Sequence, residues 1–373
     1  MHILFAGGGT AGHINPALAV AQYIAKKHPD AKISYIGKKG GMEENLVAAA
    51  GFDFYGIDVA GFQRKITPKN IIRNISAAEK AVTSSARSKK LLKNLAPDVV
   101  VGTGGYVSGP VLRQAAKLGI KTAIHEQNAY PGVTTKMLVP LVDTVMLAMA
   151  EAKTRLKLKK SPIVTGNPVR EDFLTLSKQT SKNELNLPNL PVILSVGGSL
   201  GAAPINNAVL DLIEAKWQDN DILFMHATGK AGYDAFVKEL KNRGVDIGAP
   251  NLVIKDYINN MGQCMAAADL VIARAGAITL SELSVCGKPS ILIPSPYVAE
   301  NHQFHNAMSL KRASAAEVIE EKDLNGPKLI KTVENIIHNA PKLEQMGSAA
   351  KSKSISDASK RIYDEIMKLY TTN

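Results

Sequence analysis

Short, continuously apolar runs alternate with helix-like segments along the whole chain, and this alternation limits the folds that the sequence can adopt. The apolar residues are contiguous rather than alternating with polar ones, which is typical of strands buried on both faces of a sheet. Strands separated by helices predict parallel sheets with right-handed crossovers, and therefore an α/β fold. The first half contains ILFAGG, ISYIG, DVVVGTGG, KTAIHEQN and DTVMLA, and the second half contains PVILSVGGS, ILFMHATG, LVIKDYI, ADLVIARAG and PSILIPSP.

Ten such runs in 373 residues indicate two sheets in two domains. We place the break near VTGNPVR, because Gly166 and Pro168 interrupt the pattern there and the polar stretch TLSKQTSKNELNLPNLP follows. The predicted boundaries are 1–166 for the N-terminal domain, 167–348 for the C-terminal domain and 349–373 for a helical tail.

Glycine-rich or polar segments follow strand-like runs in both halves. Ligands of parallel sheets bind outside the carboxyl ends of the strands, where these segments are expected. Backbone N–H groups and helix N-termini there are suited to binding anions. We expect a ligand cleft between the domains if the two edges face each other. The segments are AGGGTAGH, VGTGGYVSGP, IHEQN, VGGSLGAAP, ARAGAITLSE and PYVAENHQFHNA.

The first of these segments has the spacing G-x-G-x-x-G at Gly7, Gly9 and Gly12, a weak indication of a dinucleotide site. An NAD site also needs an acidic residue after the second strand, to hold the ribose hydroxyls. Lys38 and Lys39 stand there instead. If the segment binds a dinucleotide, the ligand is therefore NADP, because the two lysines could bind its 2′-phosphate.

The net charge of +12 indicates an anionic partner, and nucleic acid, an anionic membrane and phosphorylated substrates all fit. Nucleic acid is disfavoured, because aromatic residues make up 5% of the chain and no RNA-binding signature is present. No run reaches the roughly 18–20 apolar residues of a membrane span, and we expect no signal peptide. Cys264 and Cys286 belong to no C-x-x-C pair, so we expect buried free thiols in a reducing cytoplasm.

The segment ARAGAITLSELSVCGKP in the second half predicts a helix that ends at Gly287. Its first free N–H groups would come from Ala277, Ile278 and Thr279. Glu282 lies about a turn and a half from the start of this predicted helix. The carboxylate either complements the helix dipole or accepts hydrogen bonds from the two hydroxyls of a ribose, and the residues alone leave both interpretations open.

Seven motifs in a fixed order, between Phe5 and about Ala307, resemble the MurG family of bacterial peptidoglycan glycosyltransferases. The family moves N-acetylglucosamine from UDP to the 4-hydroxyl of undecaprenyl-pyrophosphoryl-N-acetylmuramyl-pentapeptide. The resemblance implies an inverting enzyme with a GT-B fold, in which two Rossmann-like domains face each other and the C-terminal helix packs back on the first. It implies no cofactor, and a peripheral position on the cytoplasmic face of the membrane. The motifs are GGTAGH, GTGGYVSGP, HEQNAYPG, TGNPVR, GGSLGA, RAGAITLSE and ENHQFHNA.

The chain departs from the family pattern at two places, where Ala11 replaces a glycine and AGAIT replaces SGALT. Both changes are small and leave the polar side chains of the motifs in place. Carried over by position, the resemblance implies a ribose ligand, backbone contacts to the nucleotide, contacts to UDP, contacts to the donor sugar and an acceptor-side loop. The ribose ligand is Glu282, and the backbone contacts to the nucleotide come from Ala277, Ile278, Thr279 and Ile258. The contacts to UDP come from Ser199 and Arg170, and those to the donor sugar from Asn128 and Gln303. The acceptor-side loop residues are Thr10, Ala11, Gly12, Gly104, Gly105 and Tyr106.

His13 is the candidate general base. Glycosyl transfer passes through an oxocarbenium-like state, and the acceptor hydroxyl becomes nucleophilic as it loses its proton. We expect the following helix to begin with Asn15 as cap and Pro16 in its first turn, so that the helix dipole keeps the imidazole of His13 neutral. Glu126 is the rival base or an orienting carboxylate, and His125 is expected in the core. His13 could also serve only to orient the loop or the acceptor.

A metal site of the D-x-D kind is disfavoured. Asp219 and Asp221 in QDND have that spacing, but they precede the strand ILFMH and so lie at its amino end. We therefore interpret QDND as a turn, and expect helix dipoles, backbone N–H groups and nearby cations to neutralise the leaving UDP.

The stretch Arg64–Lys93 is strongly basic, with Glu79 as its one acid. Its segment TPKNIIRNI starts like a helix, on which Ile71, Ile72 and Ile75 share one face. An apolar face flanked by basic residues is typical of an interfacial helix, and each basic residue near an anionic leaflet contributes about 1 kcal/mol. A solvated basic face over core isoleucines is the alternative.

Three functions remain to be weighed. The first is the lipid-linked N-acetylglucosaminyltransferase, which needs an anionic membrane surface. The second is a UDP-N-acetylglucosamine 2-epimerase of the same fold, which acts on the donor alone and needs no lipid. The third is a basic nucleic-acid-binding protein, which the low aromatic content disfavours.

Overall fold

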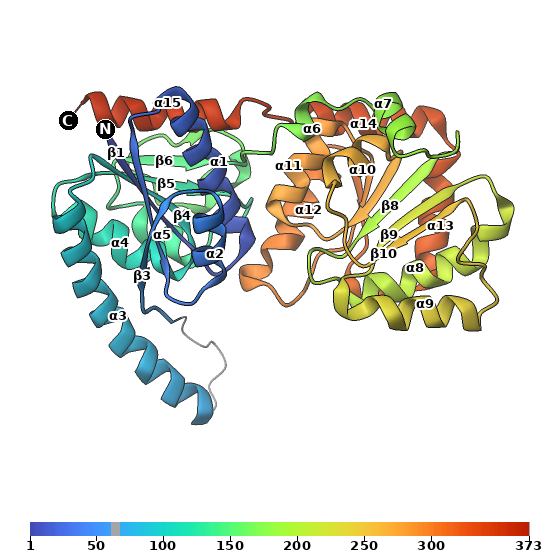
Figure 1. The fold of residues 1–373 in the computed structure, drawn as a ribbon, viewed down its shortest axis with the longest axis horizontal. Coiled ribbons are helices and arrows are strands. Elements are labelled where there is room, and N and C mark those ends of the chain that lie inside the picture. The colour runs from blue at the N-terminus through green and yellow to red at the C-terminus, as the bar shows by residue number, and fades with distance from the viewer. Residues whose placement is uncertain (61–67, 373) are drawn as a thin grey trace. The chain divides into compact units, whose positions relative to one another are not determined.

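The computed structural model describes residues 1–60 and 68–372, with the backbone alone for residues 68–79, 81 and 82. Contacts divide the chain into two compact units. Unit 1 comprises Met1–Pro168 together with Asp357–Asn373, and unit 2 comprises Val169–Ser356. Each unit is a parallel α/β sheet with its own core (Figure 1).

Unit 1 contains a seven-stranded sheet in the order β3-β2-β1-β4-β5-β6-β7, in which all neighbouring strands are parallel. The reversal of strand order between β1 and β4 is where ligands of such sheets bind. The strands are β1 His2–Gly7, β2 Lys32–Lys38, β3 Asp53–Ile57, β4 Val99–Gly104, β5 Lys121–Glu126, β6 Thr144–Leu147 and β7 Ile163–Val164. The helices are α1 Ala11–Lys27, α2 Met42–Ala49, α3 Pro68–Leu95, α4 Gly105–Lys117, α5 Val133–Leu138, the short 3₁₀ helix η1 Ala150–Arg155 and α15 Ala358–Thr371.

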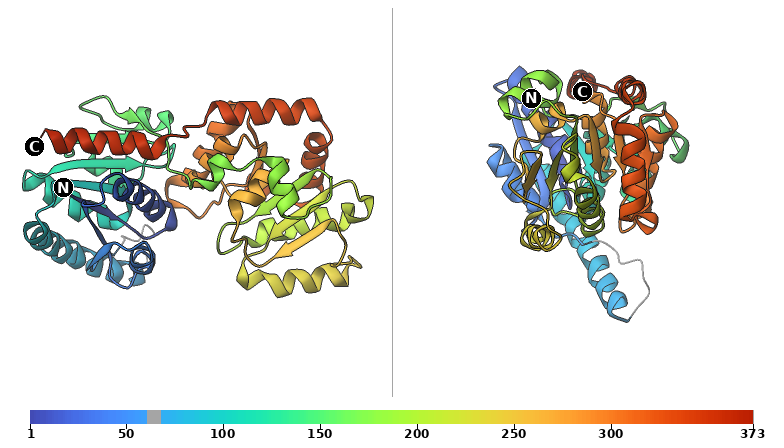
Figure 2. Two further views of the ribbon diagram at one scale, coloured as in Figure 1. Left: turned by 45° about the horizontal axis from the view of Figure 1, so that its top comes forward. Right: turned by 90° about the vertical axis from the view of Figure 1, so that its right-hand side faces the viewer.

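The sheet of unit 1 is covered on both faces, which explains why its central strands are apolar throughout. One core joins residues of β1 and β4 to α1 and to Ile362, Ile366 and Leu369 of α15. The opposite core joins the alternate strand residues to α3, α4 and α5. The C-terminal helix α15 therefore lies against α1 (Figures 1 and 2). The Tyr363 hydroxyl is 2.7 Å from Nε2 of His28 in that contact.

Unit 2 repeats the arrangement with a six-stranded sheet in the order β10-β9-β8-β11-β12-β13. Its main core joins the strands to α8, α9, α13 and α14. The strands are β8 Val192–Val196, β9 Leu223–Ala227, β10 Leu252–Lys255, β11 Leu270–Ala273, β12 Ser290–Leu292 and β13 Ala316–Val318. The helices are α6 Asp172–Thr175, α7 Lys178–Glu184, α8 Ala203–Lys216, α9 Tyr233–Asn242, α10 Met261–Ala267, α11 Ala277–Cys286, α12 His302–Arg312, α13 Gly326–Ile337 and α14 Ala340–Ser352, with 3₁₀ turns η2 Trp217–Asp219, η3 Lys230–Gly232, η4 Ala299–Asn301 and η5 Glu321–Asp323.

The prediction that the first helix begins at Asn15 and Pro16 is wrong. Helix α1 begins at Ala11, because the backbone oxygen of Thr10 accepts hydrogen bonds from the N–H groups of His13, at 3.0 Å, and Ile14, at 3.3 Å. Pro16 is the sixth residue of the helix, where its missing N–H removes a single bond. His13 consequently lies inside the first turn.

The helical tail is also interrupted. Helix α14 ends at Ser352 and α15 begins at Ala358, so that 349–373 is not one helix. The polar segment between them contains no apolar helical face, and the chain passes from unit 2 to unit 1 within it.

Both cysteines are free thiols, as predicted. Cys264 is buried, also as predicted, whereas Cys286 is only half-buried. Within the described part of the chain, no helix combines the length and apolarity that crossing a bilayer requires.

Candidate active site

The loops that follow β1 and β4 contact each other at the switch point of unit 1. Gly105 has φ +75°, and a Cβ there would lie 2.1 Å from the backbone oxygen of Gly8. Gly104 has φ +103°, and its Cβ would lie 2.8 Å from Nδ1 of His13. Neither glycine could be replaced without moving the opposite loop or the imidazole. The two glycine-rich segments therefore form one surface around His13.

The surface carries several of the acceptor-side residues predicted from the sequence. Thr10, Ala11 and Gly12 are exposed at the start of α1, and Tyr106 is exposed in the first turn of α4. The dipoles of both helices place partial positive charge near these residues. This part of unit 1 is suited to holding an anionic or polyhydroxylated ligand.

His13 is half-buried and belongs to a network that sequence reasoning missed. Its Nδ1 is 2.9 Å from Oε1 of Gln127. The amide nitrogen of Gln127 is 3.1 Å from Nδ1 of His125 and donates to the backbone oxygen of His125 at 3.0 Å. Nε2 of His125 is 2.9 Å from the backbone oxygen of Gly166. His125 lies in the core as predicted, and burial lowers its pKa.

Glu126 is almost fully buried and accepts four hydrogen bonds. Its Oε1 accepts from the backbone N–H and the side-chain amide of Asn128, both at 3.0 Å. Its Oε2 accepts from the N–H of Gly132 at 3.0 Å and from the hydroxyl of Thr135 at 2.5 Å. These donors occupy the lone pairs that a general base would use. The carboxylate therefore organises the loop between β5 and α5 and orients Asn128.

In unit 2, the loop after β8 is the counterpart of the loop after β1. Gly201 has φ +77°, and a Cβ there would lie 2.0 Å from the backbone oxygen of Thr228 at the end of β9. Ser199 is exposed at the tip of this loop, and α8 begins two residues after Gly201. The loop presents a hydroxyl and a helix N-terminus at the carboxyl edge of the sheet.

Glu282 lies in α11, which begins at Ala277 and ends before Gly287 in the left-handed conformation, as predicted. Burial raises the pKa of the Glu282 carboxyl to about 7, Arg170 lowers it and Asp172 raises it. Arg170 makes an ion pair with Asp172 at 3.3 Å and lies over the ring of Phe173. A carboxylate with this environment gains stability from any ligand that donates hydrogen bonds to it.

The remaining donor-side residues lie on two other loops of unit 2. Ile258 follows β10 and is buried, so it offers its backbone rather than its side chain. Oε1 of Gln303 accepts from the N–H of Ser295 at 2.9 Å, which turns the two N–H donors of the amide away from that contact. Glu300 and Asn301 both have positive φ angles directly before α12. Consecutive left-handed residues without glycine indicate backbone strain, which is frequent at ligand sites.

The turn predicted for QDND is confirmed. Asp219 lies in η2, before the amino end of β9, and pairs with Lys216 at 3.4 Å. Asp221 pairs with His338 at 3.4 Å. Among the described residues, no three His, Cys, Asp or Glu side chains are grouped as a metal site.

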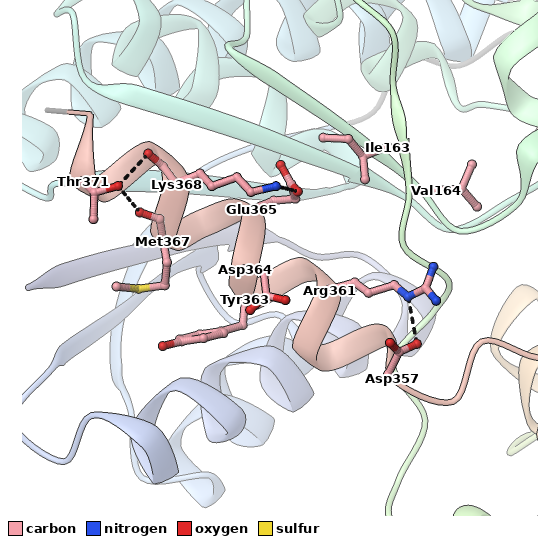
Figure 3. A pocket seen from close by; sticks show the side chains of 10 residues that line it. All are labelled: Ile163, Val164, Asp357, Arg361, Tyr363, Asp364, Glu365, Met367, Lys368 and Thr371. Carbon is pink, nitrogen blue, oxygen red and sulfur yellow. Dashed lines mark hydrogen bonds and ion pairs between the residues drawn. The ribbon is translucent and has the colours of Figure 1, made fainter.

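An open hollow of 770 Å³ lies between β7 and α15 (Figure 3). None of the predicted site residues lines it. Its charged side chains are paired along α15, with Arg361 2.8 Å from Asp357 and Lys368 2.6 Å from Glu365. The charged side chains around this hollow are therefore already paired, and the predicted site residues lie elsewhere.

Two family profiles together span most of the chain. Residues 3–147 match the glycosyltransferase family 28 N-terminal domain, and residues 192–362 match the glycosyltransferase family 28 C-terminal domain.

Two relatives that match over almost the full length have the same name. The chain is 44% identical over 367 residues to the UDP-N-acetylglucosamine–N-acetylmuramyl-(pentapeptide) pyrophosphoryl-undecaprenol N-acetylglucosamine transferase of Acetivibrio thermocellus, covering 98% of this chain and 97% of the relative. The protein of that name from Bacillus subtilis is 39% identical, with 99% of each chain covered.

Solved structures agree with these relatives. The crystal structure of Acinetobacter baumannii MurG matches with a TM-score of 0.80 and 27% identity, over 98% of this chain and 99% of that one. A UDP-GlcNAc 2-epimerase from Neisseria meningitidis matches at 0.67 and 15% identity, over 99% and 100% of the two chains, and shares the fold alone. These matches confirm the predicted α/β fold class of the GT-B type. The chain belongs to glycosyltransferase family 28 and, within it, to the MurG family.

Proposed function

We propose that the protein transfers N-acetylglucosamine from UDP-N-acetylglucosamine to the 4-hydroxyl of undecaprenyl-pyrophosphoryl-N-acetylmuramyl-pentapeptide, with inversion at the anomeric carbon. The names and full-length similarity of the relatives support the reaction. The observation that carries the mechanism is His13, an imidazole with one nitrogen hydrogen-bonded to Gln127 and the ring set against the glycine-rich loop of β4.

Unit 2 is the proposed donor domain. The carboxylate of Glu282 accepts hydrogen bonds from the two ribose hydroxyls of UDP. The N–H groups of Ala277, Ile278 and Thr279, at the start of α11, stabilise the diphosphate. Arg170, which already interacts with Glu282, adds a cation close to the nucleotide. Ser199 contacts UDP from the loop after β8.

Two further contacts complete the donor site. The backbone at Ile258 binds uracil, since the side chain is buried and only the main chain is presented. The amide of Gln303 and the amide of Asn128 contact the sugar. Each is already hydrogen-bonded through one of its groups, which fixes its orientation before substrate arrives.

Unit 1 is the proposed acceptor domain, with His13 as general base. As the acceptor oxygen bonds to the anomeric carbon, its proton passes to the imidazole. The bond between that carbon and the β-phosphate oxygen breaks, and UDP leaves with the electron pair. The loops with Thr10, Gly12 and Tyr106 hold the acceptor. Glu126 is the weaker candidate, since four donors already occupy its oxygens.

The reaction is proposed to need neither metal nor cofactor. Helix α11, the loop after β8 and Arg170 supply positive charge where the UDP diphosphate binds. Treatment with EDTA followed by desalting should leave turnover unchanged. Loss of activity that Mg²⁺ or Mn²⁺ restores would overturn this part of the proposal.

The lipid-linked acceptor requires the enzyme to work at an anionic membrane surface, on the cytoplasmic face. The described part of α3 exposes five basic side chains. Val133, Met137 and Leu141 are exposed apolar residues on and after α5. The predicted residues Arg64 and Lys65 lie outside the described residues, as do the side chains of Ile71, Ile72 and Ile75. The exposed basic residues are Lys80, Arg87, Lys89, Lys90 and Lys93.

The test is incubation of the protein with UDP-N-acetylglucosamine and the lipid-linked muramyl-pentapeptide, with mass spectrometry of the lipid product. The expected product is the lipid-linked disaccharide. In a parallel incubation without lipid, the sugar nucleotide should stay unchanged. Epimerisation at C2 in that second incubation would favour the epimerase, which shares only the fold.

A further inference from the structure

A chain of four hydrogen-bonding groups leads from a backbone carbonyl to His13. It runs from the oxygen of Gly166 through His125 and Gln127 to Nδ1 of His13, with separations of 2.9, 3.1 and 2.9 Å. We propose that Gln127, itself oriented by His125, is a positioning residue that holds His13 in the Nδ1-protonated tautomer and leaves Nε2 as the basic nitrogen. The catalytic meaning of this tautomer rests on the proposed role of His13 as base.

The donor–acceptor direction of this hydrogen-bond chain is fixed at Gly166, the end farthest from His13. A carbonyl oxygen can only accept, so Nε2 of His125 must carry a proton to bond with Gly166. His125 is 1% exposed, and burial lowers its pKa, so the ring is neutral at physiological pH. Of the charged groups near this ring, Glu126 acts in the opposite direction and is outweighed by burial. Nδ1 of His125 is therefore an acceptor.

The orientation of the Gln127 amide follows from that acceptor. Its nitrogen faces two groups that only accept, namely Nδ1 of His125 and the backbone oxygen of His125. Reversing the amide would bring its oxygen against both, with no hydrogen between them. Gln127 is 2% exposed, so water could not compensate for the lost bonds. The amide oxygen must therefore point toward His13.

The amide oxygen decides the tautomer of His13. Since Oε1 of Gln127 can only accept, Nδ1 of His13 donates the hydrogen between them. In neutral imidazole the other nitrogen, Nε2, then carries the lone pair. Among the residues that the structure describes, the ring of His13 is hydrogen-bonded to Gln127 alone. Gly104 lets the ring lie in this position, because a Cβ there would come within 2.9 Å of its Cε1.

The choice of an amide over the adjacent carboxylate has a structural cause. Side chains alternate along an extended chain, so His125 and Gln127 share one side of the end of β5, while Glu126 points to the other. A carboxylate facing His13 would hold the imidazolium form and raise its pKa. A neutral amide fixes the tautomer without placing that charge beside the ring.

The test combines nitrogen NMR of histidine-labelled protein with steady-state kinetics. The His13 signals are assigned from the spectrum of His13→Ala, since the chain has 8 histidines. In the wild type, His13 should be protonated at Nδ1. In Gln127→Met, which keeps the length of the side chain, both tautomers should appear. Its kcat should fall about 10- to 100-fold, with the KM for UDP-N-acetylglucosamine unchanged.

Substitution of His125 separates polarity from packing. His125→Gln can still donate to Gly166 and accept from Gln127, so His13 should keep its tautomer and most of its turnover. His125→Leu fills the space without accepting, and should behave like Gln127→Met. Thermal melting of each variant shows whether the fold is retained. The nitrogen spectrum reports the tautomer of His13 directly, so this reading does not depend on turnover.

Several results would overturn the proposal. These are a wild-type spectrum with His13 protonated at Nε2, and a Gln127→Met spectrum identical to the wild type. Failure of the base itself looks different: His13→Ala would keep normal turnover while the wild-type spectrum still showed the Nδ1-protonated ring. That outcome would remove the catalytic consequence of the tautomer and leave the hydrogen-bond chain in place.

Discussion

The two units share the order of six strands, to which unit 1 adds β7, but they contain different titratable side chains. In unit 1, the imidazole of His13 lies between the loops of β1 and β4. In unit 2, a carboxylate, Glu282, occupies the helix that follows β11, with a pKa raised to about 7 by burial. Both sheets supply backbone N–H groups at the same edge. Under the proposed function, both sheets provide anion binding, and the units differ in one side chain: His13 accepts a proton, whereas Glu282 binds hydroxyls.

The largest expected effect comes from removing the imidazole. His13→Ala should lower kcat by about 10²–10⁴-fold, while the affinity for UDP stays near that of the wild type, because the base acts only when the acceptor proton moves. Rapid kinetics and calorimetry measure the two quantities. Turnover close to normal from about pH 6 to about pH 9 would remove the distinction between the units.

The matching change in unit 2 should act on binding instead. Glu282→Ala removes the partner of two ribose hydroxyls and should cost about 1–3 kcal/mol of UDP affinity, roughly a 5- to 150-fold weaker Kd. Glu344→Ala, an exposed carboxylate on α14 of the same unit, serves as the matched control. If calorimetry gave equal UDP affinity for the Glu282 and Glu344 variants, Glu282 would be a partner of the helix dipole only.

A third difference concerns membrane binding. Lys89→Gln with Lys90→Gln, on α3 of unit 1, should weaken binding to anionic vesicles by about 2 kcal/mol at low salt. Lys238→Gln with Lys241→Gln, two exposed lysines on α9 of unit 2, should have little effect. Vesicle sedimentation at increasing salt measures both pairs. Equal losses would mean that net charge, rather than one surface, attracts the membrane.

The smallest effect is a pH dependence confined to the donor side. In the proposed donor site the ribose hydroxyls bind the ionised Glu282, whose pKa in the free protein is about 7, with Arg170 and Asp172 as its charged neighbours. UDP affinity should therefore be constant well above pH 7 and fall, by up to tenfold per pH unit, below it. Glu282→Gln should abolish the dependence. A wild-type affinity that is flat across neutral pH would contradict it.

The same pKa has a consequence for stability. In the unfolded chain the Glu282 carboxyl titrates near 4.5, and in the free folded protein near 7. Between these values the folded state binds the extra proton, so this group makes the free protein less stable as pH rises through that window. UDP should remove that loss, which thermal melting with and without UDP at several pH values would measure.

Central strands could be predicted from the sequence, whereas of the four edge strands β3, β7, β10 and β13 only β10 was predicted. The ten apolar runs correspond to strands β1, β2, β4, β5, β6 and β8–β12. Strands β3, β7 and β13 were missed, because they lie at or next to sheet edges, are short or half-exposed, and contain residues such as Asp53 and Glu317. A strand with one neighbour needs no continuous apolar run.

The candidate site also contains features that could be predicted from the sequence and features that could not. The position of Glu282 within α11 follows from local helix signals and was predicted correctly. The start of α1 was not, because the carbonyl of Thr10 competes with the stronger sequence signal at Pro16. The contact between His13 and Gln127 joins residues 114 positions apart, and no local pattern carries it. The catalytic and binding roles themselves stay predictions that the experiments above test.

Unit 1 is completed by residues that follow unit 2 in the chain. Ile362, Ile366 and Leu369 of α15 cover α1, which carries His13, while unit 2 is one continuous stretch between the two parts of unit 1. At a synthesis rate of about 5–20 residues per second, the ribosome needs roughly ten to forty seconds to pass through unit 2. During that interval the apolar face of α1 has no cover. A nascent chain that still lacks α15 therefore leaves this apolar surface of α1 uncovered, and a complete unit 2 can coexist with an incomplete unit 1.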